Sequence, residues 1–506
     1  SAYSELYMQD TLTQYVKVSK LLAELFEIYF SFNVANDYDR NEKAAKHIKK
    51  IKRRLTKVES LDQDRMLRNY LNVIMSSLRT NFYQLTEDGH QKPYISIKIK
   101  SVDVAAAPKP RPFAEIFIYS PRFEGLHLRN GPVARGGIRW SDRKEDYRTE
   151  ILGLVKAQHV KNTVIVPVGA KGGFVPKKML ENLTREGSLE EGVSCYKSFV
   201  SGLLDITDNL KEGKVIAPRD VIRRDNDDPY LVVAADKGTA TFSDIANSLA
   251  HDYGFWLDDA FASGGSVGYD HKKMGITARG AWVSVQRHFR ERGLNIQKDT
   301  ITVAGIGDMS GDVFGNGLLC SKTIKLLAAF DHRDIFIDPN PDPKKSYAER
   351  SRMFNLPRSS WEDYDKNLIS KGGGVFSRKL KSIDLTAEMK ILFGLNDDIT
   401  SLAPNDLIQA ILTSHVDLLW FGGIGTYVKS KSESNGAAGD RANDAIRING
   451  KDLNCKVIGE GGNLGCTQLG RIEYCLKGGM MNTDAIDNSA GVDCSDNEVN
   501  IKILLN

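Results

Sequence analysis

The segment that says most about the architecture of this chain runs Ile301-Thr302-Val303-Ala304-Gly305-Ile306-Gly307-Asp308-Met309-Ser310-Gly311. Its apolar first half predicts a buried strand, and its glycines predict a tight turn that opens a helix. In such a strand-turn-helix unit, backbone amides and the helix N-terminus face the pyrophosphate of a dinucleotide. The spacing is GxGxxxG, one residue longer than the standard fingerprint, so the alternative is a glycine-rich turn without a ligand.

The next expected strand ends at an acid, Asp331. An acid at this place can accept the ribose hydroxyls of a dinucleotide and repel a 2′-phosphate, which favours NAD over NADP. Asp338 follows another apolar run and competes for the role. The alternative for either acid is a turn cap without a ligand.

Further strands are expected at 325–330, 335–337, 416–421 and 455–458, with helical stretches between them. This alternation predicts a Rossmann-like, doubly wound parallel sheet over 298–480. Upstream, alternating or continuous apolar runs at 95–99, 115–119, 126–128 and 163–168 predict a mixed α/β domain over 91–297. Residues 1–90 show helical spacing, and 481–506 are expected to return to the first domain.

Composition excludes several classes of protein. The 41% apolar and 26% charged fractions of this 506-residue chain are ordinary for a globular protein, and a formal charge of +4 predicts no polyanion partner. The basic run 46–54 leaves nucleic-acid binding as an alternative to a solvated helix face. The six cysteines lack CxxC spacing, and the sequence contains neither a signal peptide nor an apolar run of membrane-spanning length. We therefore expect a cytoplasmic protein without a metal site, and its abrupt ends suggest a segment of a longer polypeptide.

Two lysines and one arginine stand in a second informative region. Arg135 precedes Gly136-Gly137, Lys171 precedes Gly172-Gly173, and Lys161 lies between them. Cations flanked by glycine pairs suggest carboxylate groups approached closely by the backbone. A lysine among other cations can act as an acid or base near neutral pH, since like charge and burial disfavour the ammonium form. The alternative is that the three cations are surface charges in glycine loops.

A carboxylate completes this set. Asp236 follows the apolar run Val232-Val233-Ala234-Ala235 and precedes Lys237-Gly238. Catalytic carboxylates are often presented at the end of a strand, although a simple turn aspartate fits the same pattern.

The order of these motifs, together with Thr277 and Glu460-Gly461-Gly462-Asn463, resembles the glutamate dehydrogenase superfamily. The strings 136–143 and 305–317 resemble its large, NAD-specific bacterial branch. The resemblance implies a two-domain amino-acid dehydrogenase with an α/β fold: a mixed α/β substrate domain and a Rossmann-like NAD domain, preceded by a helical segment.

The resemblance also implies roles for individual residues. Lys171 would be the catalytic lysine that polarises water, and Asp236 would shuttle the proton to and from the nitrogen. Lys161 would hold the substrate α-carboxylate. Arg135 and Ser495 would hold the side-chain carboxylate, although the family has lysine where Arg135 stands, and this change alters reach and geometry.

Seven positions correspond to cofactor contacts of the family. Asp308 would lie beside the nicotinamide ribose, where the smaller enzymes commonly have asparagine. Thr277 and Asn463 would face the nicotinamide half. The full set expected to bind NAD is Gly305, Gly307, Asp308, Met309, Asp331, Thr277 and Asn463.

The expected function is NAD-dependent oxidative deamination of L-glutamate to 2-oxoglutarate and ammonia, by a homo-oligomer without nucleic-acid or membrane partners. Substrate and cofactor would meet in a cleft between the two domains. One alternative is a dehydrogenase for another amino acid, which would need an apolar pocket in place of Arg135. Another is a non-catalytic NAD-binding regulatory protein, against which the presence of both Lys171 and Asp236 speaks.

Overall fold

The computed structural model describes residues 3–34, 36–141, 147–162, 168–177, 185–235, 240–357, 359–423 and 425–506. It divides into two compact units, one comprising Ser1–Gly268 with Glu498–Asn506 and the other Tyr269–Asn497. Within these described ranges, no helix combines the length and the apolar character needed to cross a membrane.

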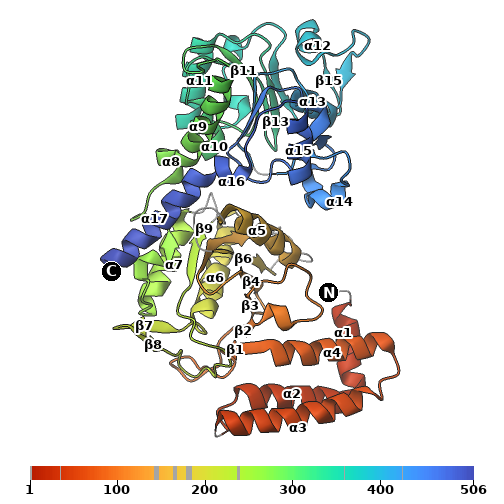
Figure 1. Ribbon diagram of the computed structural model, residues 1–506, viewed down its shortest axis with the longest axis vertical. Helices are drawn as coiled ribbons and strands as arrows, with labels where there is room; N and C mark the ends of the chain where they lie inside the picture. Colours follow the sequence, from red (N-terminus) through yellow and green to blue (C-terminus); the bar gives the residue numbers. More distant parts are fainter. Residues whose placement is uncertain are drawn as a thin grey trace. The chain divides into compact units, whose positions relative to one another are not determined.

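The first unit begins with a helical bundle, coloured red to orange in Figure 1. Apolar residues at helical spacing, including Leu22, Leu25, Ile51 and Leu67, are fully or nearly fully buried where the helices meet. The helical segment expected over 1–90 ends at Ser76, because the following residues form a strand of the sheet. The bundle consists of α1 (Glu5–Gln14), α2 (Val16–Phe30), α3 (Asp37–Leu55) and α4 (Leu61–Ser76).

A mixed sheet forms the centre of the first unit. Among the described residues it has eight strands in the order β1-β2-β3-β4-β6-β5-β9-β10. The pairs from β1 to β6 are antiparallel, and those from β6 to β10 are parallel. The strands are β1 (Ser77–Thr80), β2 (Ile95–Ile99), β3 (Ala114–Tyr119), β4 (Phe123–Arg129), β5 (Ala134–Trp140), β6 (Val168–Pro176), β9 (Val232–Ala235) and β10 (Ala262–Ser263).

Helices cover both faces of this sheet. On one face, α5 approaches so closely that a Cβ on Gly173 would lie 2.3 Å from Ile151 Cδ1. On the other face, a Cβ on Gly125 would lie 2.3 Å from Phe199 Cδ2 of α6. The remaining described elements of this unit include α5 (Tyr147–Asn162), α6 (Arg185–Leu204), α7 (Ala240–Asp252), the 3-10 turns η1 (Ser101–Asp103) and η3 (Asp258–Ala260), and a hairpin of β7 (Asn209–Lys211) and β8 (Lys214–Ile216). The strand expected at 163–168 lies outside the described residues except for Val168, which starts β6.

The second unit contains the Rossmann-like sheet. Within the described part of the chain its order is β14-β13-β12-β11-β17-β20. The strands β12, β11, β17 and β20 pair in parallel, as expected. In contrast, β13 pairs antiparallel with both β12 and β14. The expectation of parallel pairing for 335–337 was wrong because only Asp331 to Arg333 separate β12 from β13, and a parallel connection needs a long crossover. The strands are β11 (Ile301–Ile306), β12 (Ile324–Phe330), β13 (Asp334–Ile337), β14 (Gly374–Ser377), β17 (Leu418–Phe421) and β20 (Val457–Glu460).

The division between the units falls before α9 (Ile276–Glu291), ahead of the boundary expected at residue 298. This helix contacts β20, and it buries Ala278, Ala281, Trp282, Val285 and Phe289 in the core beneath the second sheet. Spacing of three or four residues places these side chains on one helix face. Helix α9 therefore belongs to the second unit and packs with its Rossmann-like sheet.

The other elements of the second unit connect and flank its strands (Figure 1). They include α8 (His271–Met274), α10 (Asp312–Leu318), α11 (Pro343–Asn355), β15 (Ile383–Asp384), α12 (Ala387–Phe393), β16 (Ser401–Leu402), α13 (Pro404–Leu412), β18 (Val428–Lys429), α14 (Asn435–Ala438), β19 (Ile448–Asn449), α15 (Gln468–Leu476), α16 (Asp484–Asp487) and the 3-10 turns η4 (Trp361–Asp363), η5 (Lys366–Leu368), η6 (Arg441–Asn443) and η7 (Gly450–Asp452). The last helix, α17 (Ser489–Leu505), starts in the second unit and ends in the first.

Candidate active site

Lys171 is buried in the middle of the first sheet, with 9% of its surface exposed. It lies inside β6 and pairs with Leu128 of β4. The register between β5 and β6 places Gly137 opposite Lys171. A glycine at that position presents no side chain to the lysine.

Arg135 lies on β5 opposite Gly169 of β6. Paired residues of a sheet point to the same face, and residues two apart on a strand do so too. Arg135 and Lys171 therefore project from the same face. With 8% exposure for Arg135 and 9% for Lys171, neither is the surface charge of a glycine loop.

Two residues that the sequence analysis missed hold Arg135. Its Nε donates a hydrogen bond to the Tyr230 hydroxyl at 2.6 Å, and its Nη2 donates to Asn500 Oδ1 at 2.7 Å. The Arg135 guanidinium carbon also lies 5.8 Å from the centre of the Tyr230 ring. These contacts fix the direction of the guanidinium group. No local sequence signal links residues 95 and 365 positions apart.

The glycine pairs in this region have a packing cause. A Cβ on Gly136 would lie 1.5 Å from the Ala170 carbonyl oxygen, and one on Gly172 would lie 3.0 Å from His127 Cδ2. Close packing therefore requires glycine at both positions, and the expected approach of the backbone to a carboxylate stays a prediction. The two glycines allow β5, β6 and their neighbours to pack closely.

The other three residues predicted for the substrate site, Lys161, Asp236 and Ser495, come from separate parts of the chain. Lys161 lies in the last turn of α5, and its side chain is outside the described part. Asp236 comes directly after β9 and lies outside the described residues. Ser495 lies on α17 within the second unit, whereas Arg135 lies in the first.

The glycine turn after β11 is formed as expected. Gly305 lies inside β11, and Gly307 has a φ of +134°, which disfavours other residues. A Cβ on Gly307 would lie 2.9 Å from Phe314 Cβ. The indole Nε1 of Trp361 donates a hydrogen bond to the Gly307 carbonyl oxygen at 3.0 Å. Trp361 was not predicted from the sequence as a functional residue, yet its hydrogen bond stabilises this turn.

Asp308 stabilises its own turn. Its Oδ1 accepts a hydrogen bond from the Ser310 backbone amide at 2.8 Å and another from the Ser310 hydroxyl. Its Oδ2 lies 3.9 Å from the Arg333 guanidinium. The predicted contact of Asp308 with the nicotinamide ribose remains a prediction.

The two acids that compete for the adenosine ribose differ in environment. Asp331 Oδ1 accepts hydrogen bonds from the backbone amides of Arg333 at 2.7 Å and Asp334 at 2.8 Å, so this acid does cap a turn. Asp338 has no exposed surface, and its Oδ1 accepts a hydrogen bond from the Ser370 amide at 3.1 Å. Burial raises the pKa of the Asp338 carboxyl above its ordinary value. The contact of Asp331 with the ribose stays a prediction.

Three further residues of the predicted cofactor set, Met309, Thr277 and Asn463, lie in different surroundings. Met309 has no exposed surface and packs in the core of the second unit, so a cofactor could reach only its backbone. Thr277 is buried, and its Oγ1 would lie 2.0 Å from a Cβ on Gly491. Asn463 Oδ1 is a buried acceptor without a hydrogen-bond partner among the described residues. This orphan acceptor fits the amide donor of a nicotinamide group.

Glu460 organises the loop that carries Asn463. Its Oε1 accepts hydrogen bonds from the Gly465 amide at 2.7 Å and the Cys466 amide at 3.3 Å, and its Oε2 accepts one from Arg471 at 2.7 Å. Complete burial raises the pKa of the Glu460 carboxyl to about 8, against the opposing effect of the Arg471 charge. From the sequence, Glu460 was expected only as part of the Glu460-Gly461-Gly462-Asn463 motif.

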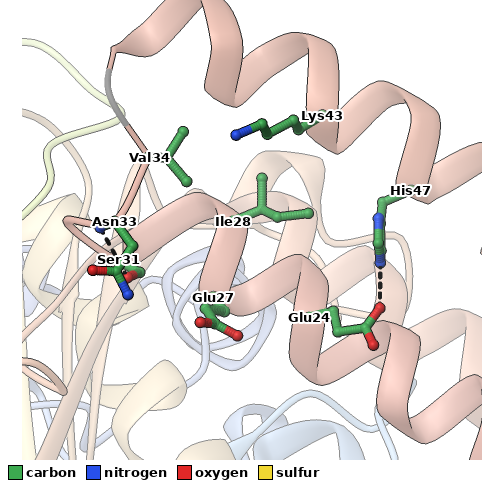
Figure 2. A pocket seen from close by; sticks show the side chains of 8 residues that line it. All are labelled: Glu24, Glu27, Ile28, Ser31, Asn33, Val34, Lys43 and His47. Atoms are coloured by element: carbon green, nitrogen blue, oxygen red, sulfur yellow. Dashed lines mark hydrogen bonds and ion pairs between the residues drawn. The ribbon is translucent and has the colours of Figure 1, made fainter.

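Two cavities are lined by none of the predicted site residues. One, of about 250 Å³, lies between α2 and α3, where His47 Nε2 pairs with Glu24 Oε2 at 2.7 Å (Figure 2). The other, of about 320 Å³, includes Gln84, Asp205 and Tyr253 in its lining.

Sequence comparison places these features in a family. A family model described as "Bacterial NAD-glutamate dehydrogenase, catalytic domain" matches residues 50–506. The chain is 60% identical to the NAD-specific glutamate dehydrogenase of Pseudomonas aeruginosa, 57% to that of Halomonas elongata and 56% to that of Mycobacterium tuberculosis, in each case over 99% of its own length. It spans 31% to 32% of the length of these relatives. On the match over residues 50–506, the chain belongs to the bacterial NAD-glutamate dehydrogenase family and contains its catalytic domain.

Proposed function

We propose that this chain carries out the NAD-dependent oxidative deamination of L-glutamate to 2-oxoglutarate and ammonia. The observation that supports this most strongly is the pair of buried cations, Arg135 and Lys171, on one face of the first sheet. Two cations withdrawn from water in this way are suited to bind an anionic substrate, because burial strengthens their electrostatic interaction with it.

Arg135 would bind the side-chain carboxylate of glutamate. Its contacts with Tyr230 and Asn500 pre-orient the guanidinium group, which reduces the entropy lost when a carboxylate binds. Ser495 would assist Arg135, and Lys161 would hold the α-carboxylate. A dehydrogenase for an apolar amino acid is the second candidate, but it would need an apolar pocket at the place where the buried Arg135 lies.

Lys171 and Asp236 would manage the protons of the reaction. When bound, NAD accepts the hydride from the substrate α-carbon. Lys171 would then hold the water that adds to the resulting imine carbon. Asp236 would deliver a proton to the nitrogen, so that ammonia leaves as the carbonyl of 2-oxoglutarate forms.

The second unit would hold the cofactor. The Gly305 and Gly307 backbone would approach the pyrophosphate, Asp308 the nicotinamide ribose and Asp331 the adenosine ribose. Thr277 and Asn463 Oδ1 would contact the nicotinamide half, and the Met309 backbone would contact the cofactor. We also propose a cytoplasmic homo-oligomer.

The direct test is glutamate-dependent formation of NADH by the full-length protein and by its Lys171→Ala variant. The proposal expects the wild-type protein to form NADH and the variant to lose at least about a hundredfold in turnover. Equal activity of the two proteins would reject the assignment of Lys171.

A further inference from the structure

The turn between β12 and β13 carries cations close to the predicted ribose site. His332 and Arg333 are exposed at this turn. Arg378, which directly follows β14, makes two hydrogen bonds to this turn. Its Nη1 donates to the Asp331 carbonyl oxygen at 2.8 Å, and its backbone amide donates to the Arg333 carbonyl oxygen at 2.8 Å. Two arginines, Arg333 and Arg378, therefore lie at the turn that begins with Asp331.

Arg333 is the cation nearest to the acids of both turns. Its Nη2 lies 3.5 Å from Asp331 Oδ2 and 3.9 Å from Asp308 Oδ2. Its side chain is 43% exposed, whereas that of Asp331 is 3% exposed. The guanidinium group therefore reaches solvent while its charge is balanced by two carboxylates.

This arrangement bears on how the protein distinguishes NAD from NADP. The two dinucleotides differ by the 2′-phosphate on the adenosine ribose, and a nearby arginine is the usual partner of that phosphate. Guanidinium groups bind phosphate oxygens through paired hydrogen bonds. Here the arginine is present, but it already faces the Asp331 carboxylate.

We propose that Arg333 is a latent 2′-phosphate site, and that Asp331 selects NAD by occupying this guanidinium group as well as by repelling the phosphate. The inference rests on the proposed function, since it concerns the cofactor of that reaction. It assigns a specificity-determining role to Arg333 and gives Asp331 a second role beside its contact with the ribose.

The Asp331→Asn substitution removes the negative charge of this side chain but keeps the oxygen that holds the turn. The asparagine oxygen can still accept hydrogen bonds from the Arg333 and Asp334 amides, so the turn is retained. The experiment measures the dissociation constants of NADH and NADPH for the full-length wild-type protein, D331N, R333Q and the double variant D331N/R333Q. Binding is followed directly, without turnover.

We expect D331N to bind NADPH at least about tenfold more tightly than wild type, the scale of one charge-assisted hydrogen bond. The double variant should lose this gain, and R333Q alone should show none. The gain should also shrink with added salt, because the new contact is between charges. Asp384→Asn, which removes an exposed carboxylate on β15, controls for net charge and should change neither constant.

Two results would overturn the inference. One is a D331N protein that gains no NADPH affinity, and the other is a double variant that keeps the full gain. Either result, with NADH binding and glutamate oxidation intact in wild type, leaves the proposed function standing. A wild-type protein that binds neither dinucleotide rejects the proposed function and this inference together.

Discussion

At the scale of single residues, the site is defined by how a few buried charges are held. Arg135 has hydrogen bonds to Tyr230 and Asn500, and both partners belong to the first unit. A charge held in this way keeps one orientation and pays less entropy on binding than a mobile surface arginine. Its partners should therefore influence how well it recognises substrate.

Arg135→Ala should lower kcat/KM for glutamate about a hundredfold, because an interaction with a charged group costs about 2 to 3 kcal/mol when lost. Tyr230→Phe removes only the hydroxyl that orients the arginine, so a smaller loss of about fivefold is expected, mainly through KM. Steady-state kinetics with glutamate measure both. An Arg135→Ala enzyme as efficient as wild type would show that another residue binds the side-chain carboxylate.

Lys171 and Asp236 should act in the reaction and not in folding. Lys171→Ala and Asp236→Asn proteins should keep their melting temperature and NADH affinity, yet lose at least about a hundredfold in turnover. If either variant turns over normally, that residue is not part of the catalytic pair. If both lose melting temperature and NADH affinity together, the two residues serve the fold.

At the scale of elements, aromatic side chains support the glycine turn. Trp361 of η4 stacks on Phe336 of β13, with ring centres 4.7 Å apart, and meets Phe314 of α10 edge-on at 5.7 Å. Its hydrogen bond to Gly307 therefore ties three elements to the segment expected to face the pyrophosphate. The indole acts as a positioning group for that turn.

Trp361→Phe should retain the stacking and lose the hydrogen bond. The expected result is a roughly fivefold weaker NADH affinity, from about 1 kcal/mol, with little change in kcat. Trp282→Phe is the matched control, because the buried Trp282 Nε1 has no hydrogen-bond partner among the described residues. Titration with NADH distinguishes them, and an equal loss in both variants would contradict a specific role for the Trp361 hydrogen bond.

His127 makes β4 sensitive to acid. It is completely buried beside Gly172, and this burial lowers the pKa of its imidazole to about 3. The unfolded chain, with a pKa of about 6.5, takes up the proton first as pH falls. The free energy of unfolding should therefore decrease by up to ~1.4 kcal/mol per pH unit between about 6.5 and 3.

His127→Leu should remove this contribution, so its unfolding free energy should depend less on pH over the same interval. Chemical denaturation at a series of pH values gives the two curves. Curves of equal slope would mean that His127 takes up its proton in the folded state as readily as in the unfolded chain.

Elements dominated by local pattern could be predicted from the sequence. The continuous apolar runs of β11 and β12 identify buried strands, and the Gly305 to Gly311 turn follows from its glycines. The antiparallel direction of β13 could not be predicted, because it depends on how the chain reverses between two similar apolar runs. Tyr230 and Asn500 were missed for a related reason, since only folding brings them to Arg135.

At the scale of the whole molecule, the proposed chemistry is divided between two units. Arg135 and Lys171 lie on the first sheet, whereas Ser495 and the residues proposed for NAD belong to the second unit. Amino-acid specificity and cofactor specificity should therefore respond to separate substitutions. Changes at Arg135 should leave NADH affinity unaltered, and changes at Asp331 should leave the preference among amino acids unaltered.

The measurement that tests the central claim most directly is NADH formation by the full-length protein with a panel of amino acids. The panel includes glutamate, aspartate, leucine, phenylalanine and alanine, with Arg135→Ala assayed in parallel. The account predicts that glutamate is oxidised with the highest kcat/KM and that Arg135→Ala erases most of this advantage. Oxidation of leucine or phenylalanine in preference to glutamate, or NADH formation from none of them, would contradict it.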